Sequence, residues 1–381
     1  MIRIIACAVI IYSLSFIPAF NQVNRNISGK NSKNALLPDK CYIKYIYEFP
    51  YESKPEFHSE RYPDLETRKY FNADLIVPLF RKILEEDFKV YDPNWWGSIR
   101  ELISQGPLPV IDTSRILKYM HTGWDTTFSI DENSIISILP VYDYPDYSTI
   151  SGLFFFESWY LDYRKGFLNK EVVAYLPIYE YWDESSLERG DQIKLKRLVC
   201  MIYNGEKNPK KIKRSSKNAP KEGYKCIYKG ITSEISLFNR PYAFYLHRGQ
   251  NEHGASDSEY NEWEYHTFDF YRDFNSERFL EALIDLTLNG RFVAEDPANP
   301  GKTLTKNEVL DLVSDKQKSK INFDDLNSVL FNEDWYLNED SLCILKKVNS
   351  IKIQRHEYQF DEYTGDFLRV VKTPLITISL K

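Results

Sequence analysis

The chain has 381 residues, of which 43% are hydrophobic and 27% charged, and its formal net charge at pH 7 is −6. This length allows two domains with their own cores, and the mild acidity excludes a global electrostatic pull toward nucleic acid or anionic membranes. Tyr and Phe, present 28 and 23 times, favour β-rich packing because large aromatic side chains suit strands.

The first 22 residues have the composition of a secretory signal peptide. One early Arg precedes an apolar run over residues 4–20, and the small Ala19 stands near its end. The alternative is an uncleaved membrane anchor, but the run is short for a span and a polar, Asn-rich stretch follows it. We therefore expect an exported protein with no integral membrane span after cleavage.

The rest of the chain presents one pattern of helices and strands twice. Residues 23–69, rich in Asn, Lys and Pro, predict an extended arm with one strand at 41–47. In the first block, the expected elements are a helix over 72–87, a short strand ending at Asp92-Pro93, a helix near 97–104, a strand at Trp159, and strands over 172–181 and 194–203. In the second, they are a helix over 276–288, a strand ending at Asp296-Pro297, a helix over 305–313, a strand at Trp335, and strands over 348–359 and 368–380.

The spacing of these blocks indicates an internal duplication. The copies lie 204 residues apart at the Asp-Pro and 176 apart at the Trp, so the first holds 28 extra residues between them. The predicted fold is α+β, with two related repeats, each of helices followed by an antiparallel β-meander. The predicted parts are a signal peptide (1–22), an extended arm (23–69), a first repeat with the 28-residue insertion (70–204), a Lys-rich and polar linker (205–265) and a second repeat (266–381).

Residues that both blocks share are mostly of structural types. Trp159 and Trp335 fit core anchors better than ligand-stacking rings, because their strands carry apolar neighbours. Asp92 and Asp296 fit turns that accept backbone hydrogen bonds, and Gly290 is a helix stop. Paired acids would suit a hydrolase, with Glu157 and Glu333 also matching, but a duplicated turn explains the pattern more simply.

No catalytic, cofactor or metal motif stands out in the sequence. His247, His253 and His266 could meet Asp257 or Glu259 at a metal, but they lack metal-binding spacing and fit exposed polar positions. We therefore expect no cofactor and no enzymatic activity.

Four cysteines follow the signal peptide, namely Cys41, Cys200, Cys226 and Cys343. Their even number in an exported chain permits disulfides, and Cys200 with Cys226 is the best candidate pair. Buried free thiols are an equally acceptable reading, since a chain of this size does not need cross-links.

Two groups of residues are candidates for partner binding. The aromatic group lacks counterparts in the second block and consists of Trp95, Trp96, Tyr142, Tyr144 and Tyr147. For Trp95 and Trp96, which follow a proline turn, an exposed contact role and packing both stay open. The basic group lies in a stretch with almost no apolar residues and is represented by Lys210, Lys211, Lys213 and Arg214. That stretch suits anionic lipid or an acidic partner, although a solvated loop explains it too. It lacks the interleaved aromatics of nucleic-acid sites.

The second block resembles the GldN/PorN family of gliding-motility proteins from the type IX secretion system of Bacteroidetes. The resemblance lies in residues 276–313, with Gly290 and Glu295-Asp296-Pro297, and in 332–354, with Glu333-Asp334-Trp335-Tyr336. Two clear copies and a Lys-rich linker depart from the family pattern and indicate a divergent member. The resemblance implies a structural subunit that joins an outer-membrane lipoprotein of the GldK/PorK type in large periplasmic rings. Alternatives are a carbohydrate- or peptide-binding envelope module and, less favoured, a hydrolase.

Overall fold

A computed structural model describes residues 40–49, 72–85, 88–95, 97–120, 125–130, 136–141, 147–162, 167–182, 194–205, 223–237, 242–247, 263–268, 274–315, 320–360 and 367–380. All of them belong to one compact unit, Leu37–Lys381. The expected signal peptide, residues 1–22, lies outside the described residues.

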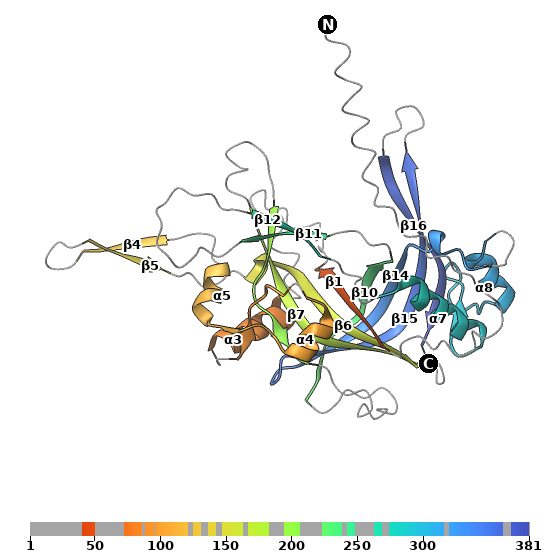
Figure 1. Cartoon of the computed structure of the whole chain (residues 1–381), viewed down its shortest axis with the longest axis horizontal. Coiled ribbons are helices and arrows are strands. Elements are labelled where there is room, and N and C mark those ends of the chain that lie inside the picture. The colour runs from red at the N-terminus through yellow and green to blue at the C-terminus, as the bar shows by residue number, and fades with distance from the viewer. Residues whose placement is uncertain are drawn as a thin grey trace, which may run out of the picture. The chain divides into compact units, whose positions relative to one another are not determined.

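The described chain is an α+β structure in which one mostly antiparallel sheet dominates and few helices accompany it (Figure 1). The main path of the sheet runs in the order β1-β6-β7-β15-β14-β10. These strands are Lys40–Glu48 (β1), Ile150–Asp162 (β6), Phe167–Trp182 (β7), Cys343–Phe360 (β15), Ser328–Asn338 (β14) and Lys225–Ser236 (β10). The outer two, β1 and β10, come within 8 Å of each other between Cα atoms, so the sheet curls.

Shorter strands extend this path. β8 (Lys194–Leu198) and β9 (Ile202–Tyr203) pair with β7, β16 (Phe367–Ser379) pairs with β15, and β13 (Val293–Glu295) pairs with β16. Two-stranded ribbons are formed by β2 (Val90–Tyr91) with β3 (Val110–Ile111), β4 (Asp125–Ile130) with β5 (Ile136–Val141), and β11 (Tyr242–His247) with β12 (Trp263–Phe268).

Strand β6 is buried on both faces because its successive side chains enter two different cores. Phe155 and Trp159 belong to the larger hydrophobic cluster, whereas Phe154 and Phe156 belong to a smaller one that also includes residues of α4 (Ile99–Gln105). Alternate residues of a strand point to opposite faces of a sheet, so a run of consecutive Phe residues can fill both cores.

The helices form where capping and apolar spacing favour them. α3 (Val77–Glu85) continues directly from a π-helical turn at Asn72–Ile76, and Pro78, which has no backbone N–H, lies just after this change from π- to α-helix. α7 (Ser276–Leu288) begins after an Asn275 side chain that accepts a bond from the Arg278 amide. α8 (Lys306–Val313) carries a capping box formed by Thr305 and Glu308, and α4 carries one formed by Ser98 and Glu101. α5 (Thr113–Met120) and 3₁₀ turns at Tyr147–Thr149 and Phe323–Asp325 complete the set.

The two strand pairs β6–β7 and β14–β15 have the same register. Trp159 lies opposite Lys170 in the first pair, and Trp335 lies opposite Lys346 in the second. Both pairs also shift register at matching points, which lie between Phe156 and Glu157 and between Asn332 and Glu333.

Matching registers continue outward to the short strands. In β7, Ala174 pairs with Tyr203 of β9, and Ile178 pairs with Leu198 of β8. The residues 176 positions later form the same pairs between β15 and β16, namely Ser350 with Ser379 and Gln354 with Pro374. A short strand precedes each Asp-Pro, and each of these strands contacts the last strand segment of its own block. The contacts are Tyr91 with Met201 and Glu295 with Thr377.

Several sequence expectations can be compared with these elements. The strand expected at 41–47 is confirmed as β1, and the expected helices and strands of both blocks coincide with α3, α4, α7, α8 and the sheet strands. The range 205–265, expected as a linker, contains β10, β11 and β12, so part of it is sheet.

Candidate functional site

The residues selected as exposed partner contacts are only partly described. Trp95 is buried, at 9% exposure, and its Nε1 donates to the Ser98 carbonyl at 3.2 Å, so the structure agrees with packing and not with an exposed contact role. The indole folds back onto the start of α4 and joins the smaller core. Tyr147 is half-buried and stacks on Phe80, with 5.5 Å between ring centroids. The other selected positions, Trp96, Tyr142, Tyr144, Lys210, Lys211, Lys213 and Arg214, lie outside the described residues.

The two Asp-Pro aspartates hold turns, as the pattern predicts. An Asp92 Oδ1 atom accepts the Asn94 amide at 2.9 Å, and Asp296 Oδ1 accepts the Ala298 amide at the same distance. Gly290 has a φ of 69°, a left-handed conformation that favours glycine after a helix. The side chains of Asp92 and Asp296 thus stabilise the backbone turns in which they lie.

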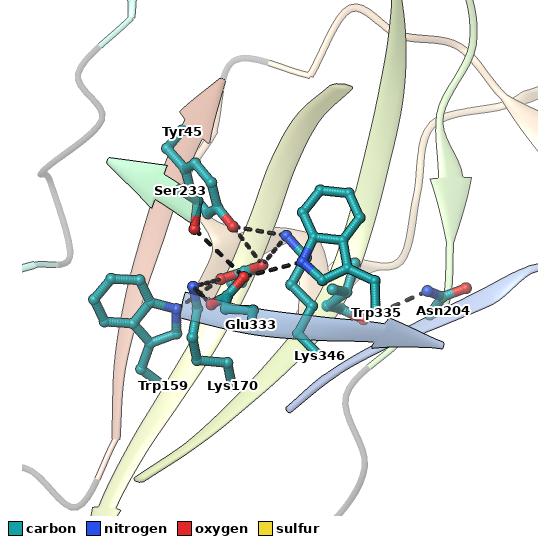
Figure 2. A network of polar contacts seen from close by, with 10 residues as sticks. Tyr45, Trp159, Lys170, Asn204, Ser233, Glu333, Trp335 and Lys346 are labelled. Carbon is teal, nitrogen blue, oxygen red and sulfur yellow. Dashed lines mark hydrogen bonds and ion pairs between the residues drawn. The ribbon is translucent and has the colours of Figure 1, made fainter. Parts of the chain in front are cut away.

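The main polar feature of the structure is a buried cluster of two glutamates and two lysines. Glu157 of β6 and Lys170 of β7 meet Glu333 of β14 and Lys346 of β15 (Figure 2), and all four side chains have 0% exposure. Lys170 Nζ lies 2.5 Å from a Glu333 oxygen, and Lys346 Nζ lies 2.8 Å from a Glu157 oxygen. Each short contact therefore joins one strand pair to the other, while Lys170 is 3.4 Å from Glu157 of its own pair.

The remaining oxygens of the glutamates are satisfied by neighbouring side chains. Trp159 Nε1 donates to Glu157 at 2.8 Å, and Trp335 Nε1 donates to Glu333 at 3.1 Å. Tyr45 of β1 receives a bond from Lys346 at 2.7 Å and donates its hydroxyl proton to Glu157 at 2.9 Å. On the equivalent side, Ser233 of β10 is 3.4 Å from Glu333. Saturation of this kind is what keeps buried charges tolerable.

Aromatic faces enclose both ammonium groups. Lys170 Nζ lies 4.1 Å from the centroid of Phe331 and 4.8 Å from that of Trp159. Lys346 Nζ lies 3.1 Å from the centroid of Phe155 and 4.2 Å from that of Trp335. Each lysine thus stacks on the Phe of the opposite strand pair and the Trp of its own.

The electrostatics of the cluster favour an ionised Glu157 and a protonated Lys346 at neutral pH. Burial alone would raise the pKa of Glu157, but Lys170 and Lys346 outweigh it and lower that pKa to about 2. Burial lowers the pKa of Lys346 to about 8, although Glu157 opposes this shift. Burial and the charge of Glu157 raise the pKa of Tyr45, so the hydroxyl stays protonated as a donor. Two carboxylates and two ammonium groups leave the cluster with no net charge.

This arrangement is suited to holding strands together and poorly suited to chemistry on a substrate. A general acid needs a proton at working pH and a path to its substrate, whereas Glu157 is ionised and its side chain is fully covered. The cluster therefore acts on the protein itself, at the junction where β7 pairs with β15 through Lys170 opposite Lys346.

A second polar group combines residue types found in hydrolases. His356 Nε2 lies 2.8 Å from Ser328 Oγ and 3.3 Å from Glu234 Oε1. A nucleophile–His–acid relay uses both ring nitrogens, one for each partner, whereas here one nitrogen faces both. Ser328 also has 0% exposure, so its hydroxyl cannot reach a substrate. This geometry does not support the hydrolase alternative.

Other sequence candidates can be placed within the described part of the chain. No group of three or more His, Cys, Asp or Glu side chains there could hold a metal ion. Among the described helices, none has the length and apolar character to cross a membrane. Cys41, Cys200, Cys226 and Cys343 are free thiols, so the pairing of Cys200 with Cys226 is wrong and the alternative of free thiols is confirmed.

Comparison with known proteins gives no assignment. Neither a scan against protein-family models nor a search of curated proteins returns a match to this chain.

Sequence reasoning identified the glutamates and tryptophans of the cluster but missed its lysines. Glu157, Trp159 and Lys170 recur after the same offset of 176 as Glu333, Trp335 and Lys346. A charged residue that keeps its place in both copies was the available signal. Tyr45 had no such signal. Its position on β1, opposite Phe155, corresponds to that of Ser233 on β10, opposite Phe331, so the two residues differ in type.

Proposed function

We propose that this chain is a non-enzymatic structural subunit, built from two copies of one α+β unit related by an internal pseudo-twofold axis. Support comes from the registers, in which strand pairings of the first copy recur 176 residues later. Lys170 pairs with its own counterpart Lys346 across antiparallel β7 and β15. Antiparallel pairing of equivalent residues is the arrangement that a twofold axis produces.

The observation that carries the structural role is the cross-pairing of buried charges. Lys170 contacts Glu333, and Lys346 contacts Glu157, so each copy supplies the counter-charge of the other. A shift of β7 along β15 would move each lysine away from the glutamate that neutralises it, and uncompensated buried charge is costly. The charged residues common to both copies therefore favour a single, fixed arrangement of the sheet, as expected for a rigid building block.

We place this subunit in the periplasm, within a gliding-motility or type IX secretion machine. Support is the signal-like N-terminus, the resemblance of 276–313 and 332–354 to the GldN/PorN family, and scaffold residues at the resembling positions. On this proposal, the chain assembles as a higher oligomer with an outer-membrane lipoprotein of the GldK/PorK type.

The test is crosslinking in intact cells followed by purification of the tagged full-length chain from solubilised envelopes. The proposal expects high-mass species that contain an outer-membrane lipoprotein. A matched variant reverses the basic stretch at Lys210, Lys211, Lys213 and Arg214, and it should reduce the yield in a salt-dependent way if that stretch faces an acidic partner or lipid. A protein that remains monomeric and without an envelope partner would refute the scaffold role. Specific retention on peptidoglycan or a glycan array instead would support the alternative of a binding module.

A further inference from the structure

From the open edges of the sheet, we infer that copies of this chain join head to tail, with β12 of one copy pairing along β16 of the next. This inference rests on the proposed scaffold function and names the partner as a second copy of the chain. Three observations on the described strands carry it.

The first observation is that the outer edge of β16 is open along its N-terminal part. β16 pairs with β15 along its length and with β13 only through Val293–Glu295, opposite 377–379. Among the described residues, no strand pairs with the other side of 367–374. Val371 is half-buried, and Thr373 and Pro374 are exposed. Figure 1 shows this end of the β15–β16 hairpin extending past neighbouring elements.

The second observation is that the counterpart of this edge is already covered within the chain. β8 has the same register on β7 that residues 370–374 have on β15. β11 lies within 8 Å of β8 between Cα atoms. This spacing is closer than the about 10 Å between stacked sheets, so β11 lies against β8, although the β11–β12 ribbon is a separate two-stranded sheet without ladder hydrogen bonds to β8.

The likeness of the two edges extends to their charged residues. Lys196 of β8 contacts Glu48 of β1, and Lys372, at the matching position of β16, lies 2.5 Å from Glu234 of β10. In both copies, a lysine of the outer strand is thus anchored to the first strand. The outer edges of β8 and β16 therefore have the same backbone register and a lysine at the same position. A strand that can lie beside β8 should also be able to lie beside β16.

The third observation is that the β11–β12 ribbon has a second edge. β12 pairs with β11 over Trp263–Phe268, and no described strand pairs with its other side. A two-stranded antiparallel ribbon presents similar hydrogen-bonding edges on both sides. With β11 beside β8, β12 is left to receive the matching edge of a neighbouring copy.

Such contacts use different surfaces on the two partners. The β11–β12 ribbon, which lies against β8 of one copy, would be extended by β16 of the next copy, whose own β12 stays open. A heterologous contact of this kind closes into a ring or continues as a filament, according to the rotation between copies. Unpaired edges are also the usual route by which sheets associate.

The test uses two edge-blocked variants of the full-length chain. One carries Val371→Glu and Thr373→Glu on β16, and the other carries Tyr265→Lys and Thr267→Lys on β12. Lys352→Glu is the matched control, because it changes the net charge as much as the β16 variant but lies on an exposed position of the interior strand β15. Association is measured by sedimentation velocity across protein concentration, with thermal unfolding as the check on folding.

The expected result is concentration-dependent association of wild type and of the control, and at least about tenfold weaker self-association of each blocked variant alone. A mixture of the two blocked variants should associate again, because each retains the edge that the other lacks. If the β16 double variant unfolds, Thr373→Glu alone takes its place.

Three outcomes would overturn the inference. A wild-type chain that stays monomeric at every concentration refutes it, even if that chain still purifies with an envelope lipoprotein, which would leave the proposed function standing. Self-association of the β12 variant alone would show a symmetric β16 contact instead. Unchanged association of both variants would place the interface elsewhere.

Discussion

Removal of one carboxylate from the buried cluster should destabilise the protein strongly. In Glu157→Gln, Lys346 loses its partner at 2.8 Å, whereas Lys170 keeps Glu333 at 2.5 Å. The cluster then holds one uncompensated positive charge with no access to water. Breaking a buried pair in this way costs about 3–5 kcal/mol, and we expect a loss of that size in the free energy of unfolding.

The assay is urea unfolding at pH 7, followed by tryptophan fluorescence, on wild type, Glu157→Gln, Lys346→Met and the double variant. The double variant restores neutrality, so it should recover most of the loss, within about 2 kcal/mol of wild type. Glu333→Gln is the matched control in the other copy and should cost about as much as Glu157→Gln. If Glu157→Gln loses less than about 1 kcal/mol, or if the double variant is no more stable than the singles, the argument from buried charge is wrong.

Three further predictions test other features of the structure. The pKa of Glu157 falls from 4.5 to about 2 on folding, so its contribution of about 3 kcal/mol is present above pH 4.5 and is lost as the pH falls to 2. Acid titration of stability should show this slope in wild type and lack it in Glu157→Gln. Trp335→Ala should lower the free energy of unfolding by about 3–5 kcal/mol, because the indole has 0% exposure, and an unchanged melting temperature would contradict its core role. Leu342 has a φ of 52°, so Leu342→Gly should be more stable than Leu342→Ala by about 1 kcal/mol in the same urea assay, the reverse of the order expected at an ordinary strand position.

Local signals in the sequence predicted local structure well. The capping box of Thr305 and Glu308 and the stop at Gly290 are set by neighbouring residues, and both helices have the expected extents. Alternating apolar residues likewise located β7 and β15. What the sequence could not supply was the partner of each strand, because β7 and β15 meet through residues far apart in the chain. For the same reason, two lysines in polar-looking strand positions gave no indication of burial.

Trp95 shows the opposite difficulty. Its place after a proline turn, without a counterpart in the second block, kept an exposed contact role open beside packing. The structure instead buries it against the start of α4, because the turn at Asp92 directs the chain back toward the sheet. An aromatic residue that only one of the two sequence blocks contains can still belong to the core.

The cross-paired cluster also bears on how the chain reaches its folded state. The hydroxyl of Tyr45 and the ammonium of Lys346 are separated by 301 residues, and Lys170 and Glu333 by 163. Contacts over such distances close large loops and are formed late, so folding should be slow. During synthesis, Glu157 emerges long before Lys346. If Glu157 were buried before that lysine is available, its carboxylate would lack part of the positive charge that compensates it. The N-terminal part of the sheet is therefore disfavoured from completing its core early, which would keep a nascent chain unfolded until nearly all of it is accessible.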